Sequence, residues 1–244
     1  MSVMGFEERK QIFRPLIPDV DFITFNNEAD LEKITTKTAG VLLETIQGGA
    51  GFIQPENGFL KKVKQRCEEV GAIMILDEIQ PGFGRTGKLF GFENYDVVPD
   101  VIVMGKGMGG GMPVGAFTAS AEMMDLLSHD PKLGHITTFG GHPVIAAACL
   151  ATLQELTETN IIAETLEKEA LFRKTLVHPL IKEIRGRGLL IVIQLKVNQT
   201  KFIRKLMDNN LLTIRAAENV VRILPPLNVK KSEINQSLKI IKKV

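Results

Sequence analysis

Two candidate reactive side chains, one acidic and one basic, each follow a short apolar run. Asp77 comes directly after the run at residues 73–76, and Lys106 comes one glycine after the run at residues 101–104. Continuous apolar runs are typical of strands that are covered on both faces of a parallel sheet. Because ligands of such sheets bind beyond the carboxyl ends of the strands, we expect Asp77 and Lys106 to reach one binding site.

The lysine lies in the glycine-rich stretch Gly105-Lys106-Gly107-Met108-Gly109-Gly110-Gly111. Glycines remove side chains, so that a ligand can approach the backbone closely. The stretch does not match a phosphate-binding P-loop, which needs four residues between its first glycine and Gly-Lys, followed by Ser or Thr. A lysine amine in this setting can instead form a Schiff base with a carbonyl group. A lone lysine among glycines is more often structural, and it is the pairing with Asp77 that favours chemistry.

Pyridoxal phosphate chemistry requires this pair of side chains. The lysine must be neutral to attack the cofactor aldehyde, and burial lowers the pKa of an ammonium toward that state. The carboxylate must stay charged and keep the pyridine nitrogen protonated, so that the ring accepts electrons. Gln80, three residues after Asp77, could donate a hydrogen bond to the ring hydroxyl. The residues therefore predict pyridoxal 5'-phosphate as the cofactor.

A P-loop nucleotidase is the rival interpretation of the same strand. There, Asp77 and Glu78 would form a Walker-B-like strand end that holds magnesium. This enzyme class also needs a Gly-x-x-x-x-Gly-Lys-Ser/Thr loop, and the sequence contains none.

The elements around these residues predict an α/β protein with two domains. Strands are expected at residues 41–43, 72–76 and 101–104, with a helix at 56–70 that Gly71 ends. Beyond them we expect helices at 143–156 and 161–176, a strand at 189–195, a helix at 200–208, strands at 211–214 and 220–224, and a helix at 232–243 with Ser232 as its N-cap. The composition changes near residue 178, which predicts a domain boundary between residues 1–178 and 179–244.

Composition narrows the class of protein. Lys plus Arg is 30 and Asp plus Glu is 28, a net charge of +2, which argues against a dedicated nucleic-acid binder. The 244 residues include no run of 18 apolar residues, so no membrane span is expected. The 2 cysteines lack metal-ligand spacing and predict reduced thiols in a cytoplasmic protein.

Six further motifs occur in a fixed order along the chain. They are Leu43-Glu44-Thr45-Ile46-Gln47-Gly48, Leu76-Asp77-Glu78-Ile79-Gln80, Gly82-Phe83-Gly84-Arg85-Thr86-Gly87, Pro99-Asp100, residues 105–116, and Thr138-Phe139-Gly140-Gly141-His142-Pro143. This order resembles the class III aminotransferases, which are fold-type-I pyridoxal-phosphate enzymes, and the acetylornithine/ornithine branch looks closest. The resemblance implies a partial large domain with a mostly parallel sheet, followed by a C-terminal α/β small domain.

The resemblance also implies the roles of the cofactor-binding residues. Lys106 would be the Schiff-base lysine and would move the proton between the substrate Cα and the cofactor. Asp77 would pair with the pyridine nitrogen, and Gln80 would contact the ring hydroxyl. Thr138 would bind the cofactor phosphate of a partner subunit, which makes the active site a property of a homodimer.

Substrate recognition is implied for two more side chains. Glu44 resembles the switch glutamate that changes its partner between the two half-reactions. Arg222 resembles the arginine that binds the substrate carboxylate, a task that suits its planar guanidinium. The reaction implied is transfer of an amino group from an ω-amino donor, such as N-acetylornithine or ornithine, to 2-oxoglutarate.

Some positions depart from the family pattern. Thr45 replaces a proline, residues 49–50 replace the usual Glu-Gly, and His142 stands where Asn or Asp is usual. We interpret Arg85 as structural, and His135 and His142 as local hydrogen-bonding residues. Family members also carry a long region before the segment that matches Ser2, including a phosphate cup. A fragment without activity of its own is therefore an alternative expectation.

Overall fold

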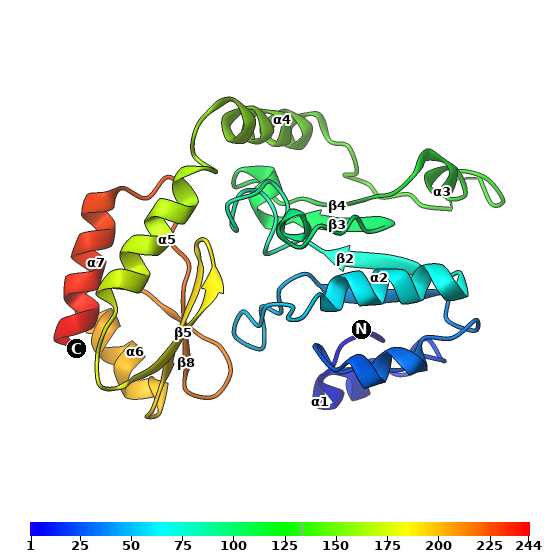
Figure 1. Ribbon diagram of the computed structural model, residues 1–244. Helices are drawn as coiled ribbons and strands as arrows, with labels where there is room; N and C mark the ends of the chain where they lie inside the picture. Colours follow the sequence, from blue (N-terminus) through cyan, green and yellow to red (C-terminus); the bar gives the residue numbers. More distant parts are fainter. Residues whose placement is uncertain (133) are drawn as a thin grey trace.

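The computed structural model describes residues 1–132 and 134–244, and within them the strands form two four-stranded sheets (Figure 1). The first contains β1 (Gly40–Glu44), β2 (Ile73–Asp77), β3 (Val101–Gly105) and β4 (Gly115–Thr118), in that spatial order. Its first three strands are parallel and β4 is antiparallel to β3. This mostly parallel sheet confirms the expected fold class.

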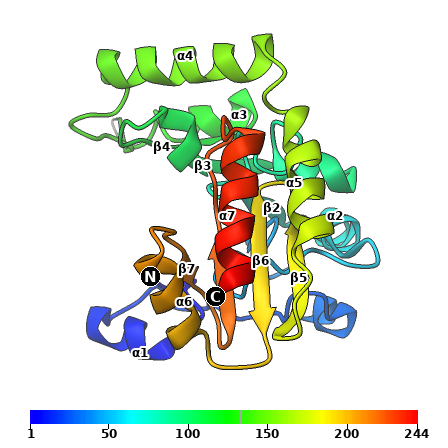
Figure 2. The same ribbon diagram turned by 90° about the vertical axis from the view of Figure 1, so that its left-hand side faces the viewer.

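The second sheet is antiparallel throughout. It contains β5 (Ile181–Arg187), β6 (Leu190–Leu195), β7 (Ile214–Arg215) and β8 (Val220–Ile223), in the spatial order β5-β6-β8-β7. Three helices cover one face of this sheet (Figure 2): α5 (Glu164–Thr175), α6 (Gln199–Asp208) and α7 (Lys231–Lys243). Their shared core contains the buried side chains Phe172, Ile191, Ile193, Leu206, Val221 and Leu238.

The main helix of the first sheet is α2 (Phe59–Val70), which buries Phe59, Leu60, Val63 and Cys67. Those side chains pack against Met74 and Leu76 of β2. The helix begins three residues later than expected, because Gly58 has a left-handed conformation at the N-cap. It ends at Gly71, as the sequence indicates, where a φ of 77° suits glycine.

The remaining elements are short except for one. They are α1 (Glu7–Lys10), η1 (Gln11–Phe13), η2 (Glu28–Lys33), η3 (Gly91–Tyr95), η4 (Lys106–Gly109), α3 (Ala121–Asp125) and α4 (Pro143–Glu158). Helix α4 lies over the end of the first sheet that carries η4 (Figure 1). No helix in residues 1–132 or 134–244 is both long and apolar enough to cross a membrane.

Several expected boundaries were wrong. Strands β4 and β5 were not predicted, and the strand expected at 211–214 is the two-residue β7 (Ile214–Arg215). Ser232 is not an N-cap, because α7 begins at Lys231 and Glu233 accepts the Lys230 backbone N–H at 2.7 Å. Helix α5 packs against the second sheet although it precedes the predicted boundary at residue 178. That boundary stays a prediction.

Both cysteines are free thiols, as expected. Cys67 is buried in α2, and this burial raises the pKa of its thiol to about 11. A thiol with such a pKa stays protonated at neutral pH and is inert.

Candidate active site

The carboxyl ends of β1, β2 and β3 bring three charged residues to one edge of the first sheet. The register pairs Glu44 with Asp77, and Asp77 with Val103. Lys106 follows β3 directly. Asp77 and Lys106 therefore lie at the ends of adjacent parallel strands.

Lys106 has a backbone conformation that is rare for a residue with a side chain. Its φ is 45°, it opens η4, and its side chain is exposed. Behind it, a Cβ at Gly107 would lie 3.3 Å from Cβ of Phe83, which is tighter than most real contacts. No carboxylate in the described part of the chain lies within ion-pair distance of the Lys106 ammonium. A left-handed residue costs on the order of 1 kcal/mol, and such strain is concentrated at functional sites.

Asp77 and Glu78 point to opposite faces, as successive residues of a strand do. Asp77 is half-buried, and its Oδ1 accepts a hydrogen bond from the Ile79 backbone N–H at 2.9 Å. Glu78 is fully buried and accepts hydrogen bonds from the Thr45 hydroxyl, from Gly91 N at 2.7 Å and from Phe92 N at 2.9 Å. Burial raises the pKa of Glu78. Glu78 thus anchors a loop and does not join Asp77 in the metal site that the rival nucleotidase interpretation requires.

Glu44 and Gln80 meet over the loop that follows β1. Glu44 Oε1 accepts the Gly48 backbone N–H at 3.0 Å. The Gln80 amide occupies the space that a side chain at Gly48 would need. Burial is the main cause that raises the pKa of Glu44; the Gly48 N–H opposes the shift, the Asp77 carboxylate adds to it, and the Lys106 ammonium opposes it. Glu44, Asp77 and Lys106 thus form one electrostatic cluster, and the Gln80 amide lies beside Gly48 next to Glu44.

Arg222 lies on the second sheet, facing the first. It pairs with Val192 in the register of β6 and β8, so both side chains are on the same face. Val192 on that face packs in a core with Ile46 and Phe52, which follow β1. The Nη2 atom of Arg222 donates to the Arg215 carbonyl at 3.3 Å, whereas its buried Nε has no hydrogen-bond partner in the described chain.

Thr138 belongs to neither sheet. It lies in an exposed turn before α4. Among the described contacts, none joins Thr138 to Glu44, Asp77, Lys106 or Arg222.

Arg85, His135 and His142 were interpreted from the sequence as structural or hydrogen-bonding residues, and the structure agrees for two of them. Arg85 is structural, since its Nη1 donates to the Pro225 carbonyl. His142 caps α4, where its Nδ1 accepts the Val144 N–H at 3.3 Å. His135 instead packs edge-on against Phe117, with ring centroids 5.3 Å apart.

The sequence interpretation missed Thr45 and Glu78 as a buried hydrogen-bonded pair. The signal was available, because alternation along β2 places Glu78 on the face opposite to Asp77. Thr45 in place of a proline supplies the hydroxyl donor.

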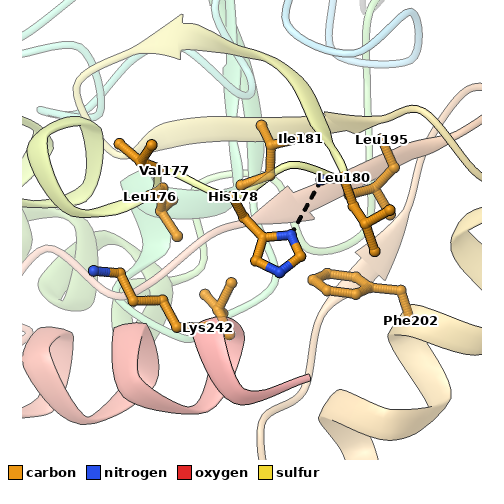
Figure 3. Close-up of a pocket in the computed structure, with 9 residues that line it drawn as sticks. Leu176, Val177, His178, Leu180, Ile181, Leu195, Phe202 and Lys242 are labelled. Atoms are coloured by element: carbon orange, nitrogen blue, oxygen red, sulfur yellow. Dashed lines mark hydrogen bonds between the residues drawn. The ribbon is translucent and has the colours of Figure 1, made fainter.

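A separate pocket lies within the second half of the chain (Figure 3). It is lined mostly by aliphatic side chains, and the Leu180 N–H donates to His178 Nδ1 at 3.2 Å across its wall. Neither Arg222 nor any candidate residue of the first sheet lines it.

Comparisons with known proteins agree on one family. The sequence profile of the family "Aminotransferase class-III" matches residues 6–244. An acetylornithine aminotransferase of Clostridium acetobutylicum is 38% identical over 98% of this chain and 62% of its own length. A [LysW]-aminoadipate semialdehyde/glutamate semialdehyde transaminase of Sulfolobus acidocaldarius is 33% identical over 99% of this chain and 63% of its own.

Solved structures agree with this result. An ornithine aminotransferase of Toxoplasma gondii, whose active site is partly occupied by pyridoxal phosphate, superimposes with a TM-score of 0.91 at 30% identity; 99% of this chain and 59% of that chain are covered. An acetylornithine aminotransferase of Elizabethkingia anophelis gives 0.82 at 33% identity, over 91% of this chain and 58% of that one.

The chain thus spans about 62% of the length of the first curated relatives it matches. The nucleotidase alternative is wrong, because the family profile covers both the Asp77 strand and the Lys106 loop. The chain belongs to the class III aminotransferases, a family of enzymes that depend on pyridoxal phosphate.

Proposed function

We propose that the protein is a transaminase that moves an amino group from an ω-amino donor to 2-oxoglutarate. The donor class is N-acetylornithine or ornithine, by similarity to relatives with those names. The observation that carries the proposal is the convergence of Asp77 and Lys106 from adjacent parallel strands. Glu44 lies beside them, and its pKa responds to both of their charges.

The residues at this edge fit pyridoxal phosphate. The glycines on both sides of Lys106 let the chain pack closely: a Cβ at Gly105 would lie 3.3 Å from the Val114 carbonyl, and one at Gly107 would lie 3.3 Å from Cβ of Phe83. The Lys106 side chain between them is exposed and can reach a ligand. The lysine has no carboxylate partner among the described residues that would compete for its amine. When bound, pyridoxal phosphate supplies an aldehyde and a ring that accepts electrons.

Each nearby side chain then has a distinct task. The Lys106 amine would hold the cofactor and would carry the proton to and from the substrate Cα. The Asp77 carboxylate, which the Ile79 N–H orients, would keep the ring nitrogen protonated. The Gln80 amide, which lies against Gly48, would donate to the ring hydroxyl. Glu44 fixes the loop at Gly48 and acts as the switch carboxylate of the substrate site.

Arg222 binds the substrate carboxylate. Its buried Nε has no partner within the described chain, and a buried guanidinium donor without an acceptor is costly. A carboxylate ligand would satisfy that donor and a second N–H in a bidentate pair. The free donor supports this role.

The working unit is a homodimer with shared active sites in the cytoplasm. Thr138 lies in an exposed turn, and no hydrogen bond described for it joins it to the cluster of its own chain. This location suits a residue that contacts the cofactor phosphate bound to the partner subunit. The division into a large domain at 1–178 and a small domain at 179–244 is part of the same proposal.

The second candidate is a chain that has no transaminase activity by itself. One observation favours it: the apolar helix α4 leaves Val144 57% and Leu150 59% exposed. An exposed apolar face of this kind is typical of an interface.

Glutamate formation from 2-oxoglutarate distinguishes the two candidates. The 244-residue chain would be assayed with added pyridoxal phosphate and with N-acetylornithine, ornithine or 4-aminobutyrate as donor. Turnover that Asp77→Ala abolishes supports the proposal. An absence of turnover with every donor favours the second candidate, and turnover that survives Asp77→Ala contradicts the assigned site.

A further inference from the structure

The segment Gly82-Phe83-Gly84-Arg85-Thr86-Gly87, here called the connecting loop, contacts both halves of the proposed site. It begins at the end of β2, where Gly82 N donates to the Glu78 carbonyl at 3.0 Å. One side of the loop touches the residue after Lys106, and the other side touches the chain after Arg222. The loop therefore links the lysine to the arginine physically.

On the lysine side, Phe83 is the contact. Its side chain is buried, and its own backbone is left-handed with a φ of 54°. It packs under Gly107 and meets the Phe90 ring edge-on, with centroids 5.6 Å apart. An aromatic residue in this conformation is strained, so the surrounding packing must hold it.

On the arginine side, Arg85 is the contact. Its Nη1 donates to the Pro225 carbonyl, and its own carbonyl accepts the Leu189 N–H at 2.9 Å. Burial lowers the pKa of Arg85, and no carboxylate of the described residues pairs with it. A half-buried guanidinium whose side-chain hydrogen bond goes to a backbone carbonyl indicates that Arg85 holds the chain in place.

The segment after Arg222 needs such an anchor. Pro225 and Pro226 lack backbone N–H groups, so they cannot extend the ladder of β8. The Lys168 Nζ donates to the carbonyl of Leu227, two residues after Pro225, at 2.6 Å. Two cationic side chains, Arg85 and Lys168, thus fix the chain directly after the strand that carries Arg222.

We propose that Arg85 is a positioning residue that sets the place of the Arg222 guanidinium relative to Lys106, by holding the Pro225 carbonyl to the connecting loop. The inference rests on the proposed function for the roles of Arg222 and Lys106. It adds that the substrate-carboxylate site depends on a side chain that touches neither substrate nor cofactor.

The test compares Arg85→Met, which keeps the aliphatic stem, with Arg85→Lys, which keeps a cationic donor. The control is Arg204→Met, on the exposed surface of α6. Three quantities are measured on the full chain: amide hydrogen exchange over residues 220–229, the affinity for pyridoxal phosphate, and the affinity of the cofactor-loaded chain for 2-oxoglutarate.

We expect Arg85→Met to speed exchange over 220–229 and to weaken 2-oxoglutarate binding about tenfold, because a small misplacement of a charged donor costs much affinity. The affinity for pyridoxal phosphate should stay within about twofold of wild type, since the Phe83 contact is intact. Arg85→Lys should recover most of the loss, and Arg204→Met should behave as wild type.

Unchanged exchange over 220–229 in Arg85→Met would overturn the inference. Equal losses of cofactor and 2-oxoglutarate affinity would also overturn it, because they indicate a general structural role. If the wild-type chain binds neither ligand, the proposed function fails separately, and the exchange result alone decides the inference.

Discussion

The two sheets of the molecule differ in how completely their own chain encloses them. In the second sheet, residues 190–193 of β6 are all buried, between three helices on one face and the loops after β1 on the other. In the first sheet, residues 101–104 of β3 are only half-buried. The proposed cofactor-binding residues lie on the less enclosed first sheet. The better packed second sheet contributes one residue to the proposed site, Arg222.

The helices show the same difference. In α7, Ile234, Leu238 and Ile241 are buried along one stripe and the opposite face is charged. Helix α4 is apolar on several sides, yet only Leu156 of its residues is buried. Burial in this protein is therefore decided by the surroundings of a helix as much as by its sequence.

Cavity-forming substitutions should give the largest effect and would measure the difference in packing between the two sheets. Ile191→Ala, in the fully buried core of the second sheet, should lower the free energy of unfolding by about 3–4 kcal/mol. Ile102→Ala, half-buried on β3, should cost only about 1 kcal/mol. Urea denaturation of both variants checks the pair, and equal losses would show that the two sheets are equally well packed.

The junction between the sheets gives the next largest effect. Gly188 has a φ of 60°, and a Cβ there would collide with the Arg85 carbonyl. Gly188→Ala should therefore destabilise the chain by about 2–3 kcal/mol. Gly58→Ala is the matched control, because Gly58 has a φ of 72° with open space around it; it should cost about 1 kcal/mol. If thermal unfolding shows a larger loss of stability for Gly58→Ala than for Gly188→Ala, the close packing between the sheets at Gly188 is contradicted.

A smaller effect comes from the buried polar pair beneath the first sheet. Thr45→Val removes the hydroxyl that donates to Glu78 and should cost about 1–2 kcal/mol. The control is Thr213→Val, because the buried Thr213 hydroxyl has no partner in the described chain; its loss should be neutral or slightly stabilising. Chemical denaturation of both variants tests the contrast, and a larger loss in Thr213→Val would refute it.

The smallest expected effect is a pH dependence from Glu44. Burial raises its pKa in the folded chain, so the folded state binds this proton more tightly than the unfolded state. Stability from this group is then fully present below its ordinary pKa of 4.5 and is lost as the pH rises through the higher folded value. Glu44→Gln keeps an acceptor for Gly48 and should flatten the decline of stability above that pH. If the pH profile of stability is unchanged in Glu44→Gln, the decline comes from another titratable group.

Local signals in the sequence predicted the chemistry-bearing edge well. The apolar runs before Asp77 and Lys106 predict their strands to within a few residues, and Gly71 predicts the end of its helix. These signals are local, because they depend on the burial of a short run and on the conformation of one glycine. Strand β4 escaped prediction because its four residues begin with a glycine, end with a threonine and contain no long apolar run. Strand β5 escaped prediction because Gly186 interrupts its pattern.

Relations across the fold could not be read in this way. That Arg85 reaches Pro225, 140 residues further along the chain, depends on how the two sheets pack. The same is true of the place of Arg222 on the face that meets the loops after β1. The direction of Glu78 was predictable from alternation along β2, but its partners at Gly91 and Phe92 were not.

The most direct test of the central claim is the attachment of pyridoxal phosphate to Lys106. Wild-type chain titrated with pyridoxal phosphate should develop the absorbance of a lysine-bound cofactor, which borohydride fixes and peptide mapping locates at Lys106. Lys106→Ala should lose both signals, and Lys88→Ala, an exposed lysine after the connecting loop, should keep them. An absorbance band that is unchanged in Lys106→Ala, or a fixed cofactor on another lysine, would contradict the account.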